Sequence, residues 1–252
     1  MKRFIPATGL MIFLLILWEV AVRLLALPEY LLPLPSTILG RAIEIHASLL
    51  VHAGYTAIEA GLGFVCGALL GMGLAGLFVR YQMLETSVYP YAIALKSVPI
   101  VAIAPLLVVW MGNGMAPKVV VAAIISFFPV VVNSVKGLRS IDPEAYDLFD
   151  SMSASRRQIF LKLRVPSALP YVFAALRISS TLAVIGAIVG EFSGADRGLG
   201  FFITVSAHRL ETVDMFVGIL MSSLLGIGYF YLVSFIEHRV VSWRREALTE
   251  EL

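Results

Sequence analysis

Charged residues are scarce in this 252-residue chain, at 14% of the total, whereas hydrophobic residues make up 59%. A soluble domain carries about 25% charged residues, so a chain this apolar would have too little polar surface to stay in solution. The composition therefore predicts an integral membrane protein. The net charge of +2 is too small to indicate a nucleic-acid partner.

Residue patterns for catalysis and metal binding are also missing. The single cysteine, Cys66, excludes an intramolecular disulfide and a cysteine-based metal cluster. The sequence has no Walker A loop, no nucleophile elbow and no zinc motif. The histidines show no ligand spacing, at His46, His52, His208 and His238. We therefore expect a chain that is not an enzyme by itself and that binds no cofactor or metal.

Long apolar runs are the main feature of the sequence. A helix needs about 20 apolar residues to cross a bilayer. The runs predict one all-α, polytopic membrane domain over residues 1–252, with six spans at about 8–27, 53–79, 88–111, 119–135, 171–192 and 213–236. The first run could also be a signal peptide, but it is long and no Ala-x-Ala cleavage site follows it, so we expect a retained span.

The segments outside these runs are short. Residues 28–52 predict a loop and an interfacial amphipathic helix with Ser36 as its N-cap, and residues 194–198 predict an outer loop. Glu19 and Arg23, four residues apart in the first span, can pair on one helix face. Glu191, near the outer end of the fifth span, is expected at an exposed headgroup position.

The basic residues predict which side each loop faces. Four of the 19 lie in one set of loops (Arg41, Lys118, Arg197, Arg209), and three lie within spans (Arg23, Lys96, Arg177). The other twelve lie at the termini and in the opposite loops: Lys2, Arg3, Arg80, Lys136, Arg139, Arg156, Arg157, Lys162, Arg164, Arg239, Arg244 and Arg245. Basic residues concentrate on the cytoplasmic side, so both termini and the segment 140–170 are predicted to be cytoplasmic.

Two glycine stripes predict close helix contacts. Gly63, Gly67 and Gly71 recur every four residues, and the 186–194 segment repeats that spacing. Small residues at this interval let helix backbones approach closely in lipid. We expect ordinary packing within the chain rather than a dedicated dimer face.

A few residues are candidates for a translocation pathway. Pro99 and its neighbouring prolines break the third span next to Lys96, and a broken helix is tolerated at membrane depth only where protein or a watery cavity satisfies its backbone. Lys96 could instead extend to the interface. Glu59 is a carboxylate inside a span. Placing a charged group there costs free energy, so such a residue is usually functional, and Lys96 or Arg177 could be its partner.

The longest polar interval, residues 140–170, predicts two short cytoplasmic helices. Asp142 precedes Pro143 as an N-cap precedes the first helical residue, and the helix is expected over 143–151. Ser155 and Gln158 match a capping box that opens the second helix, which Pro166 should end.

The second of these helices carries an apolar face of Ile159, Phe160 and Leu163. Arg156 and Arg157 beside it would contact a partner or lipid headgroups. The interval could lie on the headgroups as an amphipathic helix. The paired caps and the balance of acids and bases favour docking into a protein groove instead.

This segment resembles the EAA motif of binding-protein-dependent ABC importer permeases. That pattern is Glu-Ala-Ala, three residues, Gly, nine residues, then Ile-x-Leu-Pro. Aligned on Pro166, the motif's isoleucine falls on Leu163, its glycine on Ser153 and its glutamate on Asp147, with Leu148 and Phe149 in place of the two alanines. The spacing is kept although the first half differs.

The resemblance extends over residues 30–240. LPLPSTI, KSVPIVAIAPLLVVWMGNG, SFFPVVVNSVKGLRSIDP and GEFSGADRGLGFFI are similar to the nitrate, sulfonate and taurine branch of these permeases, which includes relatives for thiamine pyrimidine precursors and riboflavin. It implies a type I permease fold in the bacterial cytoplasmic membrane, importing a small solute by alternating access.

The resemblance also implies partners: a second permease chain, two ATPase subunits that bind ATP and Mg²⁺, and an extracytoplasmic solute-binding protein. The residues 140–170 would then be the ATPase-coupling segment. The solute stays open between an anion and a pyrimidine or flavin-type precursor. Two rival interpretations are a secondary transporter without an ATPase and a membrane anchor without transport.

Overall fold

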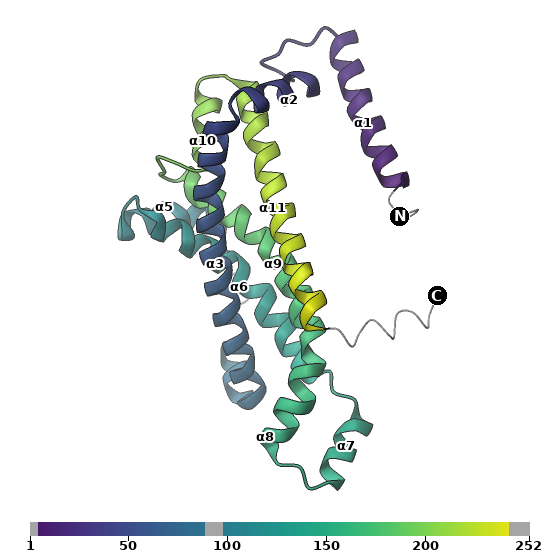
Figure 1. Ribbon diagram of the computed structural model, residues 1–252. Helices are drawn as coiled ribbons and strands as arrows, with labels where there is room; N and C mark the ends of the chain where they lie inside the picture. The colour runs from purple at the N-terminus through teal and green to yellow at the C-terminus, as the bar shows by residue number, and fades with distance from the viewer. Residues whose placement is uncertain (1–4, 89–97, 242–252) are drawn as a thin grey trace.

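The computed structural model describes residues 5–88 and 98–241, with side chains from Thr8 onward. Its described residues form helices and no strands, as predicted (Figure 1). The helices are α1 Ile5–Leu24, α2 Pro35–Glu44, α3 His46–Arg80, α5 Ile100–Met111, α6 Met115–Arg139, α7 Pro143–Ser151, α8 Arg156–Ile159, the π-helix η1 Phe160–Arg164, α9 Val165–Phe192, α10 Leu199–His208 and α11 Thr212–Val240.

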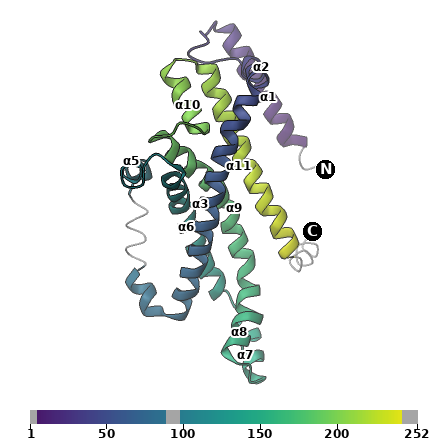
Figure 2. The same ribbon diagram turned by 60° about the vertical axis from the view of Figure 1, so that its left-hand side comes forward.

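Four long helices form the body of the molecule (Figures 1 and 2). α3, α6, the continuous helix Arg156–Phe192 and α11 are long and apolar enough to cross a membrane. In α3 the helix begins at His46, seven residues before the predicted span. α5, with 12 residues, and α10, with 10, are too short to cross a bilayer.

The predicted break of the third span at Pro99 is confirmed in the described residues. Helix α5 begins only at Ile100, and Pro99 is its N-cap residue. A proline suits a helix boundary because it has no backbone N–H to donate and its ring clashes with a preceding helical turn. Lys96 and Pro90 lie outside the described residues.

The glycine stripes pack helices within the chain, as predicted. A Cβ atom on Gly67 of α3 would lie 2.6 Å from the Ala123 carbonyl oxygen of α6. A Cβ on Gly186 of α9 would lie 2.7 Å from the Ala122 Cα on another side of α6. Glycine is required at these contacts because the backbones leave no room for a side chain. Helix α6 is thereby packed closely against both α3 and α9.

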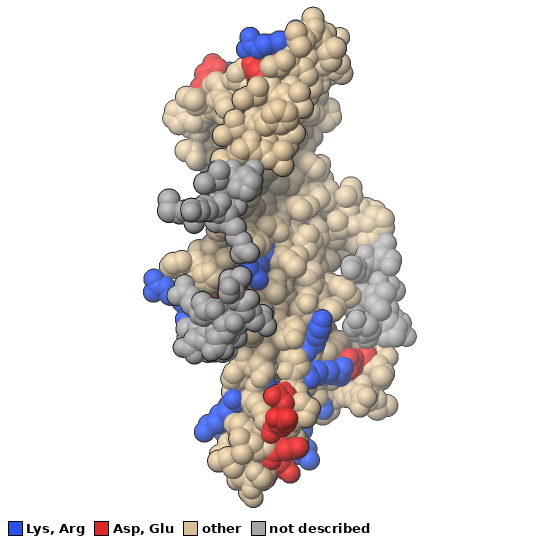
Figure 3. All heavy atoms as spheres, turned by 90° about the vertical axis from the view of Figure 1, so that its right-hand side faces the viewer, with Lys and Arg blue, Asp and Glu red and all other residues tan. Residues whose placement is uncertain are grey.

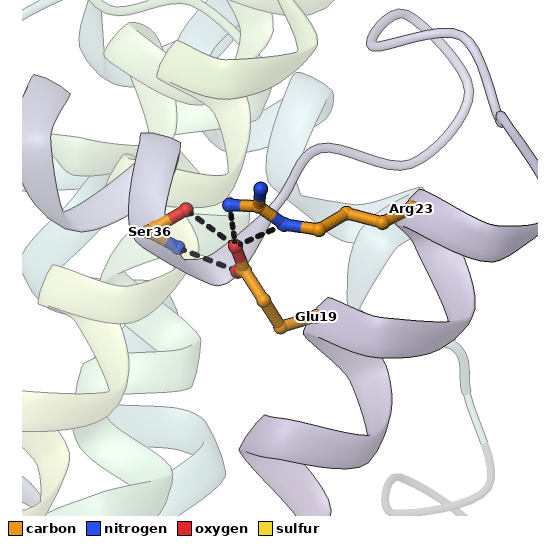
Figure 4. Close-up of polar contacts among 3 residues, drawn as sticks. All are labelled: Glu19, Arg23 and Ser36. Carbon is orange, nitrogen blue, oxygen red and sulfur yellow. Dashed lines mark hydrogen bonds and ion pairs between the residues drawn. The ribbon is translucent and has the colours of Figure 1, made fainter.

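Helix α1 lies at the edge of the bundle (Figure 1), where it contacts α2 and, through the Trp18 ring, 5.9 Å from the Phe216 ring, also α11. The Glu19 carboxylate accepts hydrogen bonds from the Ser36 N–H at 3.1 Å and the Ser36 hydroxyl at 2.8 Å (Figure 4). Arg23 pairs with Glu19 at 2.5 Å, as predicted. Ser36 is not the N-cap: α2 begins at Pro35, and Glu19 satisfies one of the free N–H groups of its first turn.

Charged side chains gather towards the ends of the molecule. Figure 3 shows the densest group at the lower end, over α7 and α8, and a smaller group at the opposite end. On the face shown in Figure 3, the described surface between these groups is mostly uncharged, with a few basic side chains at mid-height, as expected of a surface that faces the core of a bilayer. The structure therefore has two polar ends, each of which holds a candidate functional region.

Candidate functional site

The first candidate region is the knob, which we define as residues 143–164 comprising α7, the turn 152–155, α8 and η1. Asp142 caps α7 by accepting from the Glu144 N–H at 3.0 Å, as predicted. After α7 the chain reverses at Ser153, whose φ of +54° lies in the left-handed region. The Ala154 N–H bonds back to the Phe149 carbonyl at 3.0 Å. Glycine is the residue that suits such a helix end, and Ser153 stands where the EAA motif has it.

The second helix of the knob opens with the predicted capping box. The Ser155 N–H donates to the Gln158 side chain at 2.7 Å, and the Gln158 N–H donates to the Ser155 hydroxyl at 3.3 Å. Pro166 does not end this helix, contrary to the prediction. A π turn precedes it, in which the Val165 N–H bonds to the Phe160 carbonyl, and the chain continues as α9. Pro166 thus directly follows the π turn inside a continuous helix, and this local change of hydrogen-bond register accommodates a residue that has no N–H.

The apolar surface of the knob differs from the predicted one. Ile159 is 7% exposed and packs within its own chain, while Phe160 is exposed and Leu163 is partly buried. Leu148 is 59% exposed and Met152 72% exposed, although neither was identified from the sequence as a docking residue. One feature of the sequence could have identified Leu148 as a docking residue. It replaces an alanine of the motif, and a large apolar side chain exposed on a polar helix indicates a partner surface.

The charged residues of the knob surround this apolar surface. Asp147, Arg156 and Arg157 are all exposed, and none forms an ion pair with another described residue. Their charges are therefore available to a partner, where opposite charges steer association and fix orientation.

The second candidate region is the outer clamp, which we define as His52, Thr56 and Glu191 around the start of α10. The Gly198 N–H donates to His52 Nδ1 at 3.1 Å and the Leu199 N–H to the Thr56 hydroxyl at 2.8 Å. The Gly200 N–H donates to Glu191 Oε2, and the Thr56 hydroxyl donates to Glu191 Oε1 at 2.6 Å. Side chains of α3 and α9 thus satisfy the free N–H groups at the start of α10.

Glu191 was predicted to be exposed near the headgroups, and this is wrong because its side chain is 2% exposed. A carboxylate is favoured at this position by the positive end of α10. Lys118, which was assigned to an outer loop, is also buried. Its ammonium donates to three carbonyl oxygens, those of Asn113 at 2.7 Å, Gly114 at 2.9 Å and Gly194 at 2.7 Å.

The predicted pathway residues do not come together. Glu59 is buried beside Glu191, and its Oε2 has no hydrogen-bond partner in the described part of the chain. Arg177 pairs instead with Glu237 of α11, with Nε 3.2 Å from Oε2. Pro99 lies at the start of α5, and Lys96 falls outside the described residues. The pairing of Glu59 with Arg177 that we considered from the sequence is therefore wrong.

Residues 63–242 match the family described as the binding-protein-dependent transport system inner membrane component. This match covers more than half of the chain and contains the knob, the continuous helix and most of the bundle. The chain belongs to this family. It is a non-catalytic permease subunit of an ABC importer, and separate ATPase subunits hydrolyse ATP. Family membership favours this interpretation over a secondary transporter.

Similar proteins support the same assignment. The chain is 37% identical over 236 residues to the formylaminopyrimidine transport permease protein ThiX of Halalkalibacterium halodurans, covering 93% of this chain and 94% of that protein. It is 32% identical over 243 residues to the riboflavin transport system permease protein RibX of Chloroflexus aurantiacus, covering 94% and 91%. The permease of an amino acid ABC transporter shares the fold, with a TM-score of 0.65 at 15% identity, covering 79% of this chain and 97% of that one.

Proposed function

We propose that this permease imports a pyrimidine or flavin-type vitamin precursor, and that it works as a pair of permease chains with two ATPase subunits and a solute-binding protein. The relatives named above transport formylaminopyrimidine and riboflavin. The alternative class, sulfonates and taurine, is represented by relatives of 28% and 25% identity.

The observation that carries the choice of substrate class is that two cations of the bundle, the buried Lys118 and the partly buried Arg177, already have partners. All three N–H groups of Lys118 can be used by backbone carbonyls, and Arg177 is paired with Glu237. Neither cation is left to hold an anionic solute in the described bundle. Glu59, with an unpartnered oxygen, offers a hydrogen-bond acceptor of the kind that recognises the N–H and amino groups of a heterocycle.

The knob is the surface proposed to dock into the ATPase. Its exposed apolar side chains include Leu148, Met152 and Leu161, and they alternate along the chain with exposed charges of both signs. The helix that follows the knob continues without a break through α9, so movement of the knob is transmitted to the bundle. Binding and hydrolysis of ATP and Mg²⁺ at the partner subunits would then bias the bundle between outward- and inward-facing states.

Charge distribution supports the proposed topology. The knob lies at the end of the molecule opposite α2 and α10 (Figure 1), and it carries the densest group of charges (Figure 3). We place this end and both chain termini in the cytoplasm, following the excess of basic residues there.

The test is reconstitution of the chain with its ATPase in liposomes, together with binding proteins loaded with a thiamine pyrimidine precursor, a flavin, or taurine. We expect ATP hydrolysis to rise with the protein loaded with the pyrimidine or flavin and not with the taurine-loaded protein. Stimulation by taurine alone would overturn the substrate class. Absence of any co-purifying ATPase would overturn the docking role of the knob.

A further inference from the structure

The start of α10 depends on one histidine ring. Gly198, Leu199 and Gly200 are buried, so water cannot satisfy their backbone N–H groups, and the outer clamp supplies an acceptor for each of them. The acceptor for the Gly198 N–H is Nδ1 of His52, at 3.1 Å. A backbone N–H group can only donate, so this Nδ1 carries no proton. The outer clamp is therefore assembled around an imidazole ring whose Nδ1 must stay unprotonated.

Two other histidines make the opposite kind of contact. Nδ1 of His46 lies 2.8 Å from a backbone carbonyl oxygen, and Nδ1 of His208 lies 2.7 Å from another. A carbonyl oxygen can only accept, so Nδ1 carries a proton in both of these rings, and protonation of the other ring nitrogen leaves the contact intact. At His52, protonation would place an N–H group against the Gly198 N–H group. The bond to Gly198 would then be lost.

The charges around His52 would add to this effect. The Arg197 guanidinium lies 5.1 Å from the centre of the Tyr55 ring and donates to the Tyr55 hydroxyl. Tyr55 follows His52 by three residues on α3, so this contact keeps a positive charge close to the imidazole, and a charged imidazole would be repelled by it. The other charged groups on the elements packed around the clamp are Glu59 on α3, Lys118 on α6, Glu191 on α9, Asp196 in the 194–198 loop, and the pair Arg41 and Asp214 on α2 and α11.

The position of the His52 ring is coupled to α10. The ring lies against Phe201 and Phe202 of α10, with centroid distances of 5.9 and 5.6 Å, so displacement of the imidazole disturbs the packing of this helix. The chain enters α10 at Gly198 with a φ of +109°, which glycine adopts without steric cost and can also leave freely. His52 is only partly buried, so protons from the solvent can reach it.

We propose that His52 is an acid-sensitive switch: protonation of its ring releases the Gly198 N–H and loosens the first turn of α10. The proposal rests on the proposed topology, in which the end of the molecule that holds α10 faces the outside (Figure 1). The contact holds at neutral pH and is lost as the external pH falls through the range in which histidine titrates. Uptake by this permease thereby becomes sensitive to external acid.

The experiment measures hydrogen exchange in the complex of this chain with its ATPase, held in nanodiscs, at about pH 7.5 and about pH 5.5. Each rate is divided by the rate of an unstructured amide at the same pH to give its protection. The protection of the Gly198 and Leu199 amides should fall about tenfold at the lower pH, while that of the central amides of α6 stays constant. His52→Asn should abolish this response, because an amide oxygen accepts the same hydrogen bond and does not titrate. His52→Phe should show the low protection at both pH values.

The matched control is His208→Asn, which removes an exposed histidine from α10 whose Nδ1 donates to a carbonyl. It should keep the response of the wild type. Unchanged protection in the wild type at the lower pH would overturn the switch. An equal fall in His52→Asn would assign the response to another group, such as Glu191, and would overturn it as well.

A second measurement connects the switch to transport. Proteoliposomes are supplied with a thiamine pyrimidine precursor and its binding protein, and only the external solution is acidified. Uptake should fall in the wild type relative to His52→Asn, because the variant keeps α10 attached. Equal uptake at low pH would overturn the effect on transport. If neither protein takes up the precursor at any pH, the proposed function fails, while the exchange experiment still decides whether His52 is the switch.

Discussion

Arg177 of α9 and Glu237 of α11 form an ion pair across the bundle, with Arg177 Nε 3.2 Å from Glu237 Oε2. The side chain of Glu237 is 11% exposed and that of Arg177 is 31% exposed. The two charges attract at this separation, although Oε2 does not meet hydrogen-bond geometry. The pair therefore holds α11 against α9 through charge, in a region where both helices are apolar.

Removing one member of this pair should destabilise the bundle. Arg177→Ala leaves Glu237 charged and nearly buried without a partner. The expected loss lies between the roughly 0–1 kcal/mol of an exposed pair and the roughly 3–5 kcal/mol of a fully buried one. The measurement is thermal unfolding of the purified complex in detergent, where we expect a lower Tm.

The double variant Arg177→Met/Glu237→Leu separates charge from packing. It should recover most of the Tm, because two apolar side chains need no charge partner. Arg239→Ala, an exposed arginine in the last turn of α11, is the matched control and should leave Tm nearly unchanged. A single variant as stable as the wild type would show that the pair contributes nothing.

Ser153 offers a test of the turn within the knob. Its φ of +54° is unfavourable for residues with a side chain, by roughly 1–2 kcal/mol. Ser153→Gly should therefore raise the stability of the knob by up to about 1 kcal/mol and keep ATPase coupling, whereas Ser153→Val should reduce both. Ala154→Gly is the control, because a glycine next to the left-handed residue adds only flexibility. Tm and coupled ATP hydrolysis together would check the prediction, and an improvement with valine would contradict it.

The sequence predicted those parts of the structure that depend on local patterns. The Asp142 cap, the capping box of Ser155 and Gln158, and the all-α membrane fold are confirmed because each depends on residues close in the chain or on composition. The glycine stripes also indicated the right kind of contact, since close packing follows from spacing.

The errors involve partners that are distant in the sequence. The predicted exposure of Glu191 was wrong because its hydrogen-bond donors are the Thr56 hydroxyl on α3 and a backbone N–H of α10. No local sequence pattern reveals these distant partners. Ile159, which the sequence placed on the apolar docking face of the second helix, is 7% exposed because it packs against distant parts of its own chain. The π turn that lets the helix continue was not foreseen.

The exposed apolar residues of the knob predict which changes break ATPase docking. Leu148→Asp or Met152→Asp should prevent the ATPase from co-purifying while leaving the amount of membrane-inserted chain unchanged, because both side chains are exposed. Ile159→Asp should instead lower the amount of folded chain, since it buries a carboxylate. Leu210→Asp at the opposite end is the matched control for an exposed leucine, and it should retain the ATPase. Normal co-purification with both knob variants would refute docking through this surface.

The outer clamp predicts a destabilisation localised to α10. The Thr56 hydroxyl both accepts from the Leu199 N–H and donates to Glu191, so Thr56→Val leaves two buried polar groups short of a partner. The expected loss is about 1–3 kcal/mol, and hydrogen exchange should quicken at the first amides of α10 while the centre of α6 stays protected. Thr86→Val is the control, because the exposed Thr86 hydroxyl bonds only to carbonyls of its own helical stretch. Equal exchange in the two variants would mean that backbone packing, and not the clamp, holds α10 in place.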